Sequence, residues 1–135
     1  MDLDLIKRIE LSGILKVGGG MLPPRHNFSQ ISNNVLDDEN LPIEVKGLYA
    51  IVRRWITYYE EQRLDKEFLR KKCKVGIDKF DRMWKELKTH GYLKQYRVSC
   101  GKNRFVYVYD LLDEPDLKNT GTINISLRDF NQNAQ

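Results

Sequence analysis

The hydrophobic residues of this chain recur first with the period of a helix and later with the period of a strand. Between residues 43 and 90, apolar positions are spaced by three or four residues, which predicts helices with one buried face. After Gly91 the pattern changes and favours two strands, over 93–98 and 104–109. The segment between these strands contains Gly101, as expected at a hairpin turn.

Polar residues and a proline mark where the first predicted helices begin. Ser32 or Asn33 can cap a short helix that extends to about Asp38. We expect the longest helix to begin near Pro42, because proline is favoured in a first helical turn. The predicted buried stripe of that helix consists of Val45, Leu48, Tyr49, Val52, Trp55, Ile56 and Tyr59.

Two shorter predicted helices follow and are joined by a tight turn. Asp65 is expected to cap a helix over 66–73. Asp78 is expected to cap the next helix, over 78–90, and Gly91 to end it in a left-handed conformation. The predicted buried residues of these two helices are Phe68, Leu69 and Cys73, then Phe80, Met83, Trp84 and Leu87.

This order of elements predicts an α+β fold that is mainly α. A short helix, a turn, a longer helix and a hairpin are typical of a winged helix-turn-helix, with a three-helix core and a C-terminal β-hairpin wing. We expect that domain over 27–110, after an N-terminal arm (1–26) and before a polar C-terminal extension (111–135). Two patterns favour regular structure outside the domain, a helix or strand within Leu3, Ile6, Ile9 and Leu11, and an edge strand at Ile123, Ile125 and Leu127.

Basic charge is concentrated in one part of the chain. The 135 residues have a net charge of +4. Between Arg63 and Tyr107, 14 lysines and arginines face 5 aspartates and glutamates, a net charge of +9. The rest of the chain has 9 basic and 14 acidic residues, a net charge of −5. This asymmetry favours a polyanionic partner, although a charge run is often only a solvated surface.

We predict that the partner is double-stranded DNA. The major groove has the width of one helix with its side chains, and the predicted helix 78–90 has a polar face opposite its buried stripe. Arg82, Lys85 and Thr89 lie on that face and Lys79 flanks it, so these residues are expected to enter the groove. Further predicted contacts to phosphates come from the preceding helix and from the wing, at Lys66, Lys71, Lys74, Lys94, Arg97, Lys102 and Arg104.

Two stretches of the chain resemble a known family. These are FSQISNNVLDDENLPIEVKGLYAIV, with Lys46-Gly47-Leu48 opening the long helix, and LRKKCKVGIDKFDRMWKELKTHGYLKQYRV, with Gly91-Tyr92-Leu93 before the wing. They resemble the winged-helix N-terminal domain of phage and plasmid replication initiators of the replisome-organiser or DnaD-like type, over residues 27–109. Arg70 departs from the family, which usually has a small residue there. The resemblance implies DNA binding in replication initiation or in transcription control of a mobile element.

Other classes of function have less support in the sequence. No nucleophile motif, phosphate loop or metal-ligand spacing is present, so we expect neither an enzyme nor a cofactor nor a metal site. His26 and His90 are far apart, and Cys73 and Cys100 stand alone, which is typical of reduced thiols in a cytoplasmic protein. No apolar run approaches the length of a membrane span, and the acidic start is unlike a signal peptide.

Three binding hypotheses remain open. The first is duplex DNA, with a homodimer or a replication or transcription protein as further possible partners. The second is a winged helix that binds protein and no DNA, using wing tyrosines as a contact surface. The third is single-stranded DNA stacked on the same tyrosines, which normally requires a sheet platform that a two-stranded wing does not supply. The tyrosines in question are Tyr92, Tyr96, Tyr107 and Tyr109.

Overall fold

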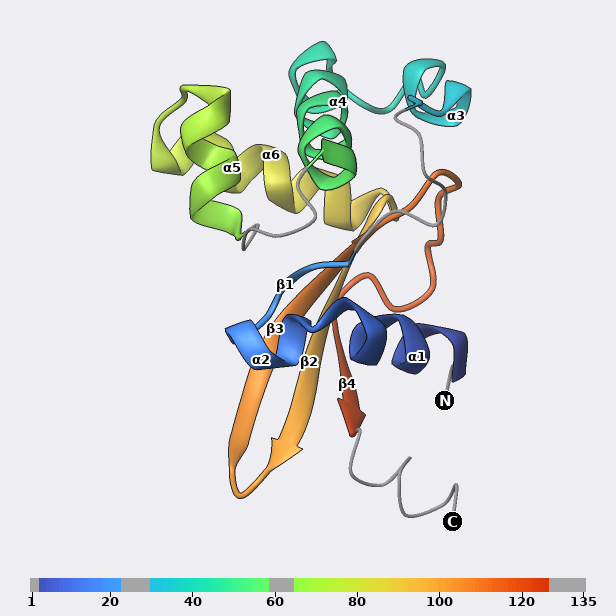
Figure 1. The fold of residues 1–135 in the computed structure, drawn as a ribbon. Helices are drawn as coiled ribbons and strands as arrows, with labels where there is room; N and C mark the ends of the chain where they lie inside the picture. The colour runs from blue at the N-terminus through green and yellow to red at the C-terminus, as the bar shows by residue number, and fades with distance from the viewer. Residues whose placement is uncertain (1–2, 23–29, 59–64, 127–135) are drawn as a thin grey trace.

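Helices pack around one end and one face of a mixed four-stranded sheet (Figure 1). The computed structural model describes residues 3–22, 30–58 and 65–126. It confirms the predicted α+β class, and the strand order in the sheet is β1-β3-β2-β4. In chain order the elements are α1 (Leu3–Ser12), α2 (Ile14–Val17), β1 (Gly20–Met21), α3 (Asn33–Leu36), α4 (Ile43–Tyr58), α5 (Lys66–Cys73), α6 (Ile77–Thr89), β2 (Leu93–Gly101), β3 (Arg104–Leu111) and β4 (Thr122–Ser126).

The helices α4, α5 and α6 pack against one another and form the larger hydrophobic core. The buried stripe predicted for α4 is confirmed at its described positions except Trp55, which is only partly buried; Tyr59 lies outside the described residues. The predicted stripe of α6 is buried throughout, and its Trp84 ring contacts Tyr109 of β3 at 5.3 Å between centroids. Leu93 and Leu111, at the ends of β2 and β3, complete this core, which we call the helical core.

Side chains cap two of the helices as the sequence predicts, but not α6. Ser32 Oγ accepts a hydrogen bond from the Asn34 amide at the start of α3, and Asp65 Oδ1 accepts one from Phe68 N–H at the start of α5. The prediction that Asp78 caps the next helix was wrong. The first helical hydrogen bond already uses the Gly76 carbonyl, so α6 begins at Ile77 and Asp78 lies in its first turn, where a carboxylate suits the helix dipole.

Gly91 follows the C-cap of α6 and adopts the left-handed conformation, as predicted. Its φ of 84° is the left-handed conformation, and a Cβ at this position would lie 2.6 Å from the Asp116 carbonyl oxygen. The Tyr92 amide donates to the Leu87 carbonyl, which satisfies a carbonyl of the last turn. The chain therefore needs glycine here for both the backbone turn and the close contact with the loop after β3.

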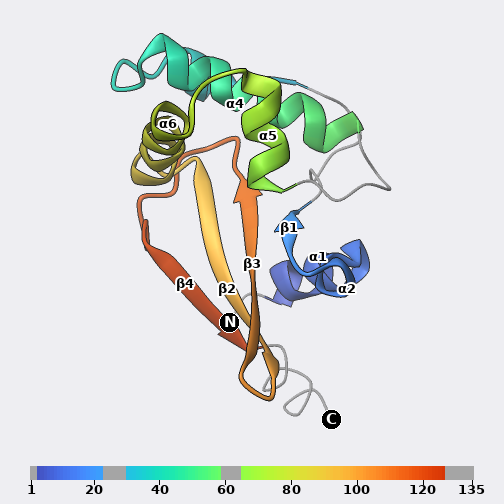
Figure 2. The same cartoon turned by 90° about the vertical axis from the view of Figure 1, so that its left-hand side faces the viewer.

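The sheet is larger than the two-stranded wing that the sequence predicts (Figure 2). The hairpin of β2 and β3 forms as expected, but both strands extend beyond the predicted bounds. β4 adds in parallel to β2 at one edge, which confirms the predicted edge strand at Ile123 and Ile125, whereas Leu127 lies outside the described residues. β1 adds in parallel to β3 at the other edge. The larger sheet arises because residues 20–21 and 122–126, far apart in the chain, pair with the two outer edges of the hairpin.

The hairpin turns at Lys102 and Asn103, whose φ angles of 50° and 60° are those of a type I′ turn. Gly101 is not one of the two turn residues. It pairs with Arg104, and the register shift between Ser99 and Gly101 marks a bulge just before the turn.

A second, smaller core lies between α1, α2 and one face of the sheet, and we call it the sheet core. In Figure 1, α1 and α2 cross the front of the strands. Arg8 of α1 makes a two-pronged ion pair with Asp110 of β3, with N–O distances of 3.1 and 3.2 Å. The segment 3–22, predicted as an arm, therefore covers the sheet. The buried members of this core are Leu5, Ile6, Ile9, Ile14, Leu22, Val98, Val108 and Ile125.

The loop after β3 is fixed to the helices by polar contacts. The Tyr49 hydroxyl donates to the Leu112 carbonyl at 2.8 Å, and the Arg53 guanidinium lies 2.8 Å from an Asp113 carboxylate oxygen. Lys94 is only 3% exposed, and its ammonium donates to the carbonyls of Asp116 and Lys118. These bonds satisfy the buried ammonium, and they bring the loop back across the start of β2.

Candidate nucleic-acid interface

The exposed face of α6 is the first candidate surface. The helix buries Phe80 and Trp84 in the helical core, and this orientation directs Lys79, Arg82 and Lys85 to the surface. The side chains of Lys79 and Arg82 are 47% and 67% exposed. The predicted residue Thr89 is also exposed, in the last turn.

Besides the exposed Asp78 in the first turn of α6, two carboxylates that form ion pairs lie beside this face. Glu44 of α4 is 3.8 Å from both the Lys79 ammonium and the Arg82 guanidinium, and sequence reasoning missed it because it comes from a different helix. Asp81 forms a 2.9 Å ion pair with Lys66 of α5. Pairs between exposed groups of this kind contribute little, about 0–1 kcal/mol, so a polyanion can displace them.

Three lysines converge where α5, α6 and the sheet meet. Lys66 lies 5.7 Å above the Trp84 ring, and Lys88 donates a hydrogen bond to the Gln95 side chain of β2. Partial burial lowers the pKa of Lys88, and the nearby charges of Lys66 and Lys85 lower it further. We call Lys66, Lys85 and Lys88 the lysine cluster. An anion bound there would relieve their mutual repulsion.

The remaining predicted residues of α5 lie at its C-terminal end. Lys71 and Lys74 are exposed, and Lys74 adopts the left-handed conformation that ends the helix. Lys72 lies above the Trp55 and Phe68 rings, at 4.5 and 5.3 Å from their centroids. These cations are thus at the opposite end of α5 from Lys66, which is in its first turn.

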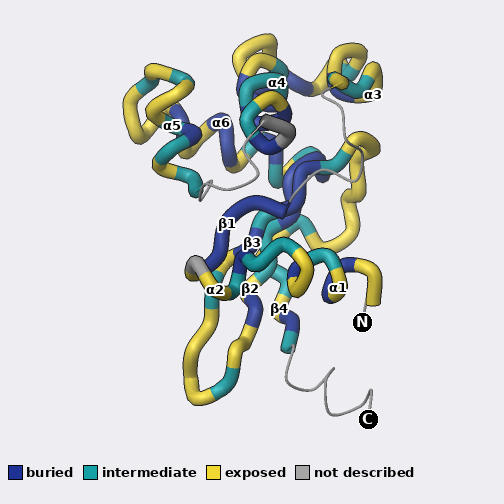
Figure 3. The backbone as a smooth tube through the Cα atoms, in the orientation of Figure 1, coloured by how far each residue is buried: buried dark blue, intermediate teal, exposed yellow. Residues whose placement is uncertain are grey.

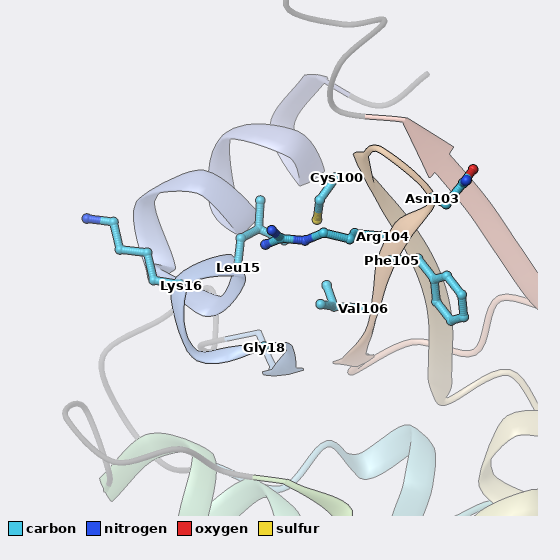
Figure 4. Close-up of a pocket in the computed structure, with 8 residues that line it drawn as sticks. All are labelled: Leu15, Lys16, Gly18, Cys100, Asn103, Arg104, Phe105 and Val106. Atoms are coloured by element: carbon cyan, nitrogen blue, oxygen red, sulfur yellow. The ribbon is translucent and has the colours of Figure 1, made fainter.

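The hairpin does not present its four predicted basic residues together. Lys94 is buried and bonded to the loop after β3, so the expectation of a surface contact at that position is corrected. Lys102 is exposed at the tip. Arg97 is exposed and its guanidinium stacks on Phe105, 3.8 Å from the ring centroid. Arg104 points to the other side, toward Leu15 of α2, as Figure 4 shows.

The wing tyrosines also differ in exposure. Tyr92 is buried, and its hydroxyl donates to Asp38 Oδ2 at 2.7 Å, so it is a structural residue. Tyr96 and Tyr109 are partly buried, on opposite faces of the sheet. Tyr107 is 43% exposed and lies edge-on to Phe105. Sequence reasoning did not include Phe105 among the candidates, although alternation places it on the same face as Tyr107.

The part of the chain that the structure describes offers few groups for metal binding or thiol chemistry. There, no three His, Cys, Asp or Glu residues are grouped so that they could hold a metal ion. Cys73 and Cys100 are both free thiols, and burial raises the pKa of the Cys73 thiol, which favours its unreactive protonated form. His26 lies outside the described residues, and His90 forms the C-cap of α6.

The chain was compared with known proteins on the basis of both sequence and structure. No protein-family model, no curated protein and no solved structure matches it. Across residues 3–22, 30–58 and 65–126, no helix combines the length and the apolar character that crossing a membrane requires.

Proposed function

We propose that the chain binds double-stranded DNA as a winged helix-turn-helix, with α6 in the major groove. The observation on which this depends is the two-sided character of α6. Its apolar face is buried against α4 and the sheet, while Lys79, Arg82 and Lys85 extend from the opposite face. A helix of this kind can enter the groove without exposing the core.

Two neighbouring features support this proposal. The turn between α5 and α6 comprises only residues 74–76, and α4, α5 and α6 all contact one another, as in a helix-turn-helix. Lys66 adds a cation beside α6, and Lys102 adds one at the exposed hairpin tip. We leave Lys94 and Arg104 out of the proposed duplex contact, because the first is buried and the second points toward α2.

The first experiment measures fluorescence anisotropy of a labelled random-sequence duplex across a range of salt concentrations. We expect log affinity to fall linearly with log salt, with a slope of about −3 to −5 for a handful of phosphate contacts. No binding at about 50 mM salt would contradict the proposal and would favour a protein partner for the same fold.

Arg82→Ala on α6 is the variant that tests the groove contact. On a duplex selected for tight binding, we expect a loss of about 1–3 kcal/mol if Arg82 contacts a base, and a smaller loss on random duplex. Lys7→Ala removes one positive charge from the exposed side of α1 and is the matched control. Equal losses for Arg82→Ala and Lys7→Ala would show that only net charge matters and would overturn the role of α6.

A further inference from the structure

The face of the sheet opposite α1 has a composition unlike that of the rest of the molecule. Cross-strand pairing fixes which side chains share it, since directly paired residues point to the same side. Three rows cross β3, β2 and β4 in turn: Phe105, Ser99 and Ser126; Tyr107, Arg97 and Asn124; Tyr109, Gln95 and Thr122. We call these nine positions the open face. None of them is acidic and none is aliphatic.

The aromatic residues of the open face form a column along β3. Successive members are two residues apart, about 7 Å along a strand. Phe105 and Tyr107 are 44% and 43% exposed, and Tyr109 lies partly buried where the column reaches Trp84 of α6. Figure 3 shows that the half of the hairpin beyond α2 is largely exposed. Half-exposed rings in a row offer π-faces on which planar groups can stack.

Polar groups accompany this column on the neighbouring strands. A hollow of about 510 Å³ lies beside Phe105 and is also lined by Arg97, Ser99 and Asn124. Its side chains supply both hydrogen-bond donors and acceptors. Arg97 presents a flat guanidinium on Phe105, and a base can stack on such a plane as it does on an aromatic ring.

The open face leads directly to the lysine cluster. Gln95 in its third row accepts a hydrogen bond from Lys88, and Lys66 lies over Trp84, whose ring contacts Tyr109. A polymer that follows β3 from the hairpin tip toward α6 would thus meet aromatic rings first and three ammonium groups at the end. Its charge would be matched by Arg97 and the lysine cluster, with no carboxylate among the nine positions.

We propose that the open face binds single-stranded DNA, with bases stacked on Tyr107 and on the Arg97–Phe105 pair, and phosphates near Arg97 and the lysine cluster. Stacking on aromatic residues along a basic track is how single strands are bound without sequence preference. Protein interfaces also use aromatic residues and arginine, but they are depleted in lysine and serine. The open face includes Ser99 and Ser126 and leads to the lysine cluster, which favours a nucleic acid over a protein partner or a second copy of this chain. The choice of DNA over RNA rests on the proposed function. The aromatic rows are separate from the exposed face of α6, and the two surfaces share only Lys66 and Lys85.

The test measures anisotropy of a labelled oligothymidylate of about 12 nucleotides with the full chain. We expect Tyr107→Thr to weaken binding about tenfold or more, and the Phe105→Thr, Tyr107→Thr double variant to weaken it further. Threonine keeps the strand propensity, and circular dichroism and thermal unfolding check that each variant folds. Tyr107→Phe keeps the ring and should bind as the wild type does. Unchanged binding by the double variant would overturn the proposal.

A cation on the open face and a cation on α1 provide a matched pair. Arg97→Gln should weaken single-strand binding about fivefold or more, whereas Lys7→Gln, on the exposed side of the helix that covers the other face of the sheet, should leave it unchanged. Equal losses in the two variants would show a non-specific charge effect and overturn the assignment to the open face.

Duplex and single-strand binding are separable by further variants. Arg82→Ala should reduce duplex binding and spare the oligothymidylate, while the aromatic double variant should do the reverse. If the duplex proposal fails but the oligothymidylate still binds through Phe105 and Tyr107, the open face stands alone. Tighter binding of oligouridylate would overturn the choice of DNA. A dimer in analytical ultracentrifugation that the double variant dissociates would identify a second copy as the occupant and overturn the proposal.

Discussion

Tyr92 shows how a single hydroxyl joins distant parts of this chain. It is 1% exposed, and its single hydroxyl proton is shared between Asp38 Oδ2 at 2.7 Å and the Asn34 carbonyl oxygen at 3.1 Å. These bonds connect the start of β2 with α3 and the loop behind it. The hydrogen bond from Tyr92 lowers the pKa of Asp38 below its ordinary value of 3.8, and the Asn40 amide lowers it further.

Tyr92→Phe should therefore change both stability and its dependence on pH. We expect a loss of about 1 kcal/mol in the free energy of unfolding at neutral pH. Because the folded pKa of Asp38 is depressed, its contribution is present above about pH 4 and is lost as pH falls through the folded value. The variant should lose less stability than the wild type between about pH 4 and pH 2 in urea unfolding.

Tyr107→Phe is the control for this prediction, since its hydroxyl is on an exposed residue of the sheet. Its urea midpoint should match the wild type at both pH values. If Tyr92→Phe kept the full acid sensitivity of the wild type, the Tyr92–Asp38 bond would not be the source of that sensitivity.

At the scale of elements, α1 is the clearest departure from expectation. The sequence indicates a helix or a strand within an arm, and the structure resolves this into a helix that covers the sheet. Ile6 and Ile9 are 0% exposed in the sheet core, and the Arg8–Asp110 ion pair fixes the helix to β3. Because Ile6 and Ile9 are fully buried, α1 contributes hydrophobic stabilisation and belongs to the folded unit.

Ile9→Ala measures the contribution of α1 to stability. Removal of a buried isoleucine side chain should cost about 2–4 kcal/mol in urea or thermal unfolding, through lost burial and the cavity left behind. Leu11→Ala on the same helix is the control, because Leu11 is 88% exposed and should change stability by less than about 0.5 kcal/mol. Similar small effects in both variants would mean that α1 does not stabilise the fold.

For the molecule as a whole, the question is whether two hydrophobic cores act as one. The helical core and the sheet core share β2 and β3. Leu93 and Leu111 belong to the first core, and Val98 and Val108 belong to the second. A strand cannot lose its partner at one end without weakening the ladder at the other, so we expect the two cores to unfold together.

The two tryptophans make this testable, because Trp55 and Trp84 both contact the helical core, whereas Ile9 lies in the sheet core. In Ile9→Ala, the unfolding transition seen by tryptophan fluorescence should shift as far as the transition seen by circular dichroism. A fluorescence transition that stays at its wild-type position would show instead that the helical core unfolds as a separate unit.

Local features of the chain were determined by the sequence alone. Helical periodicity predicted the inward faces of α4, α5 and α6, because a helix that must bury one face repeats its apolar residues every three or four positions. Trp55, Phe68 and Cys73 are nevertheless only partly buried. The caps at Ser32 and Asp65 and the left-handed Gly91 were predicted because each depends on neighbours within a few residues. The basic segment from Arg63 to Tyr107, which includes α6, was identified by counting charges along the sequence.

Long-range pairing was decided only by the tertiary structure. Lys94 and Arg97 look equivalent in the sequence, yet the first is buried under the loop after β3 and the second lies on the open face. Local alternation predicts an edge strand at Ile123 and Ile125 but not its partner. No local pattern states that residues 20–21 join the other edge of the hairpin, or that α1 covers one face and leaves the other open. Such contacts join residues from 27 to 102 positions apart, where packing of the whole chain determines the partner.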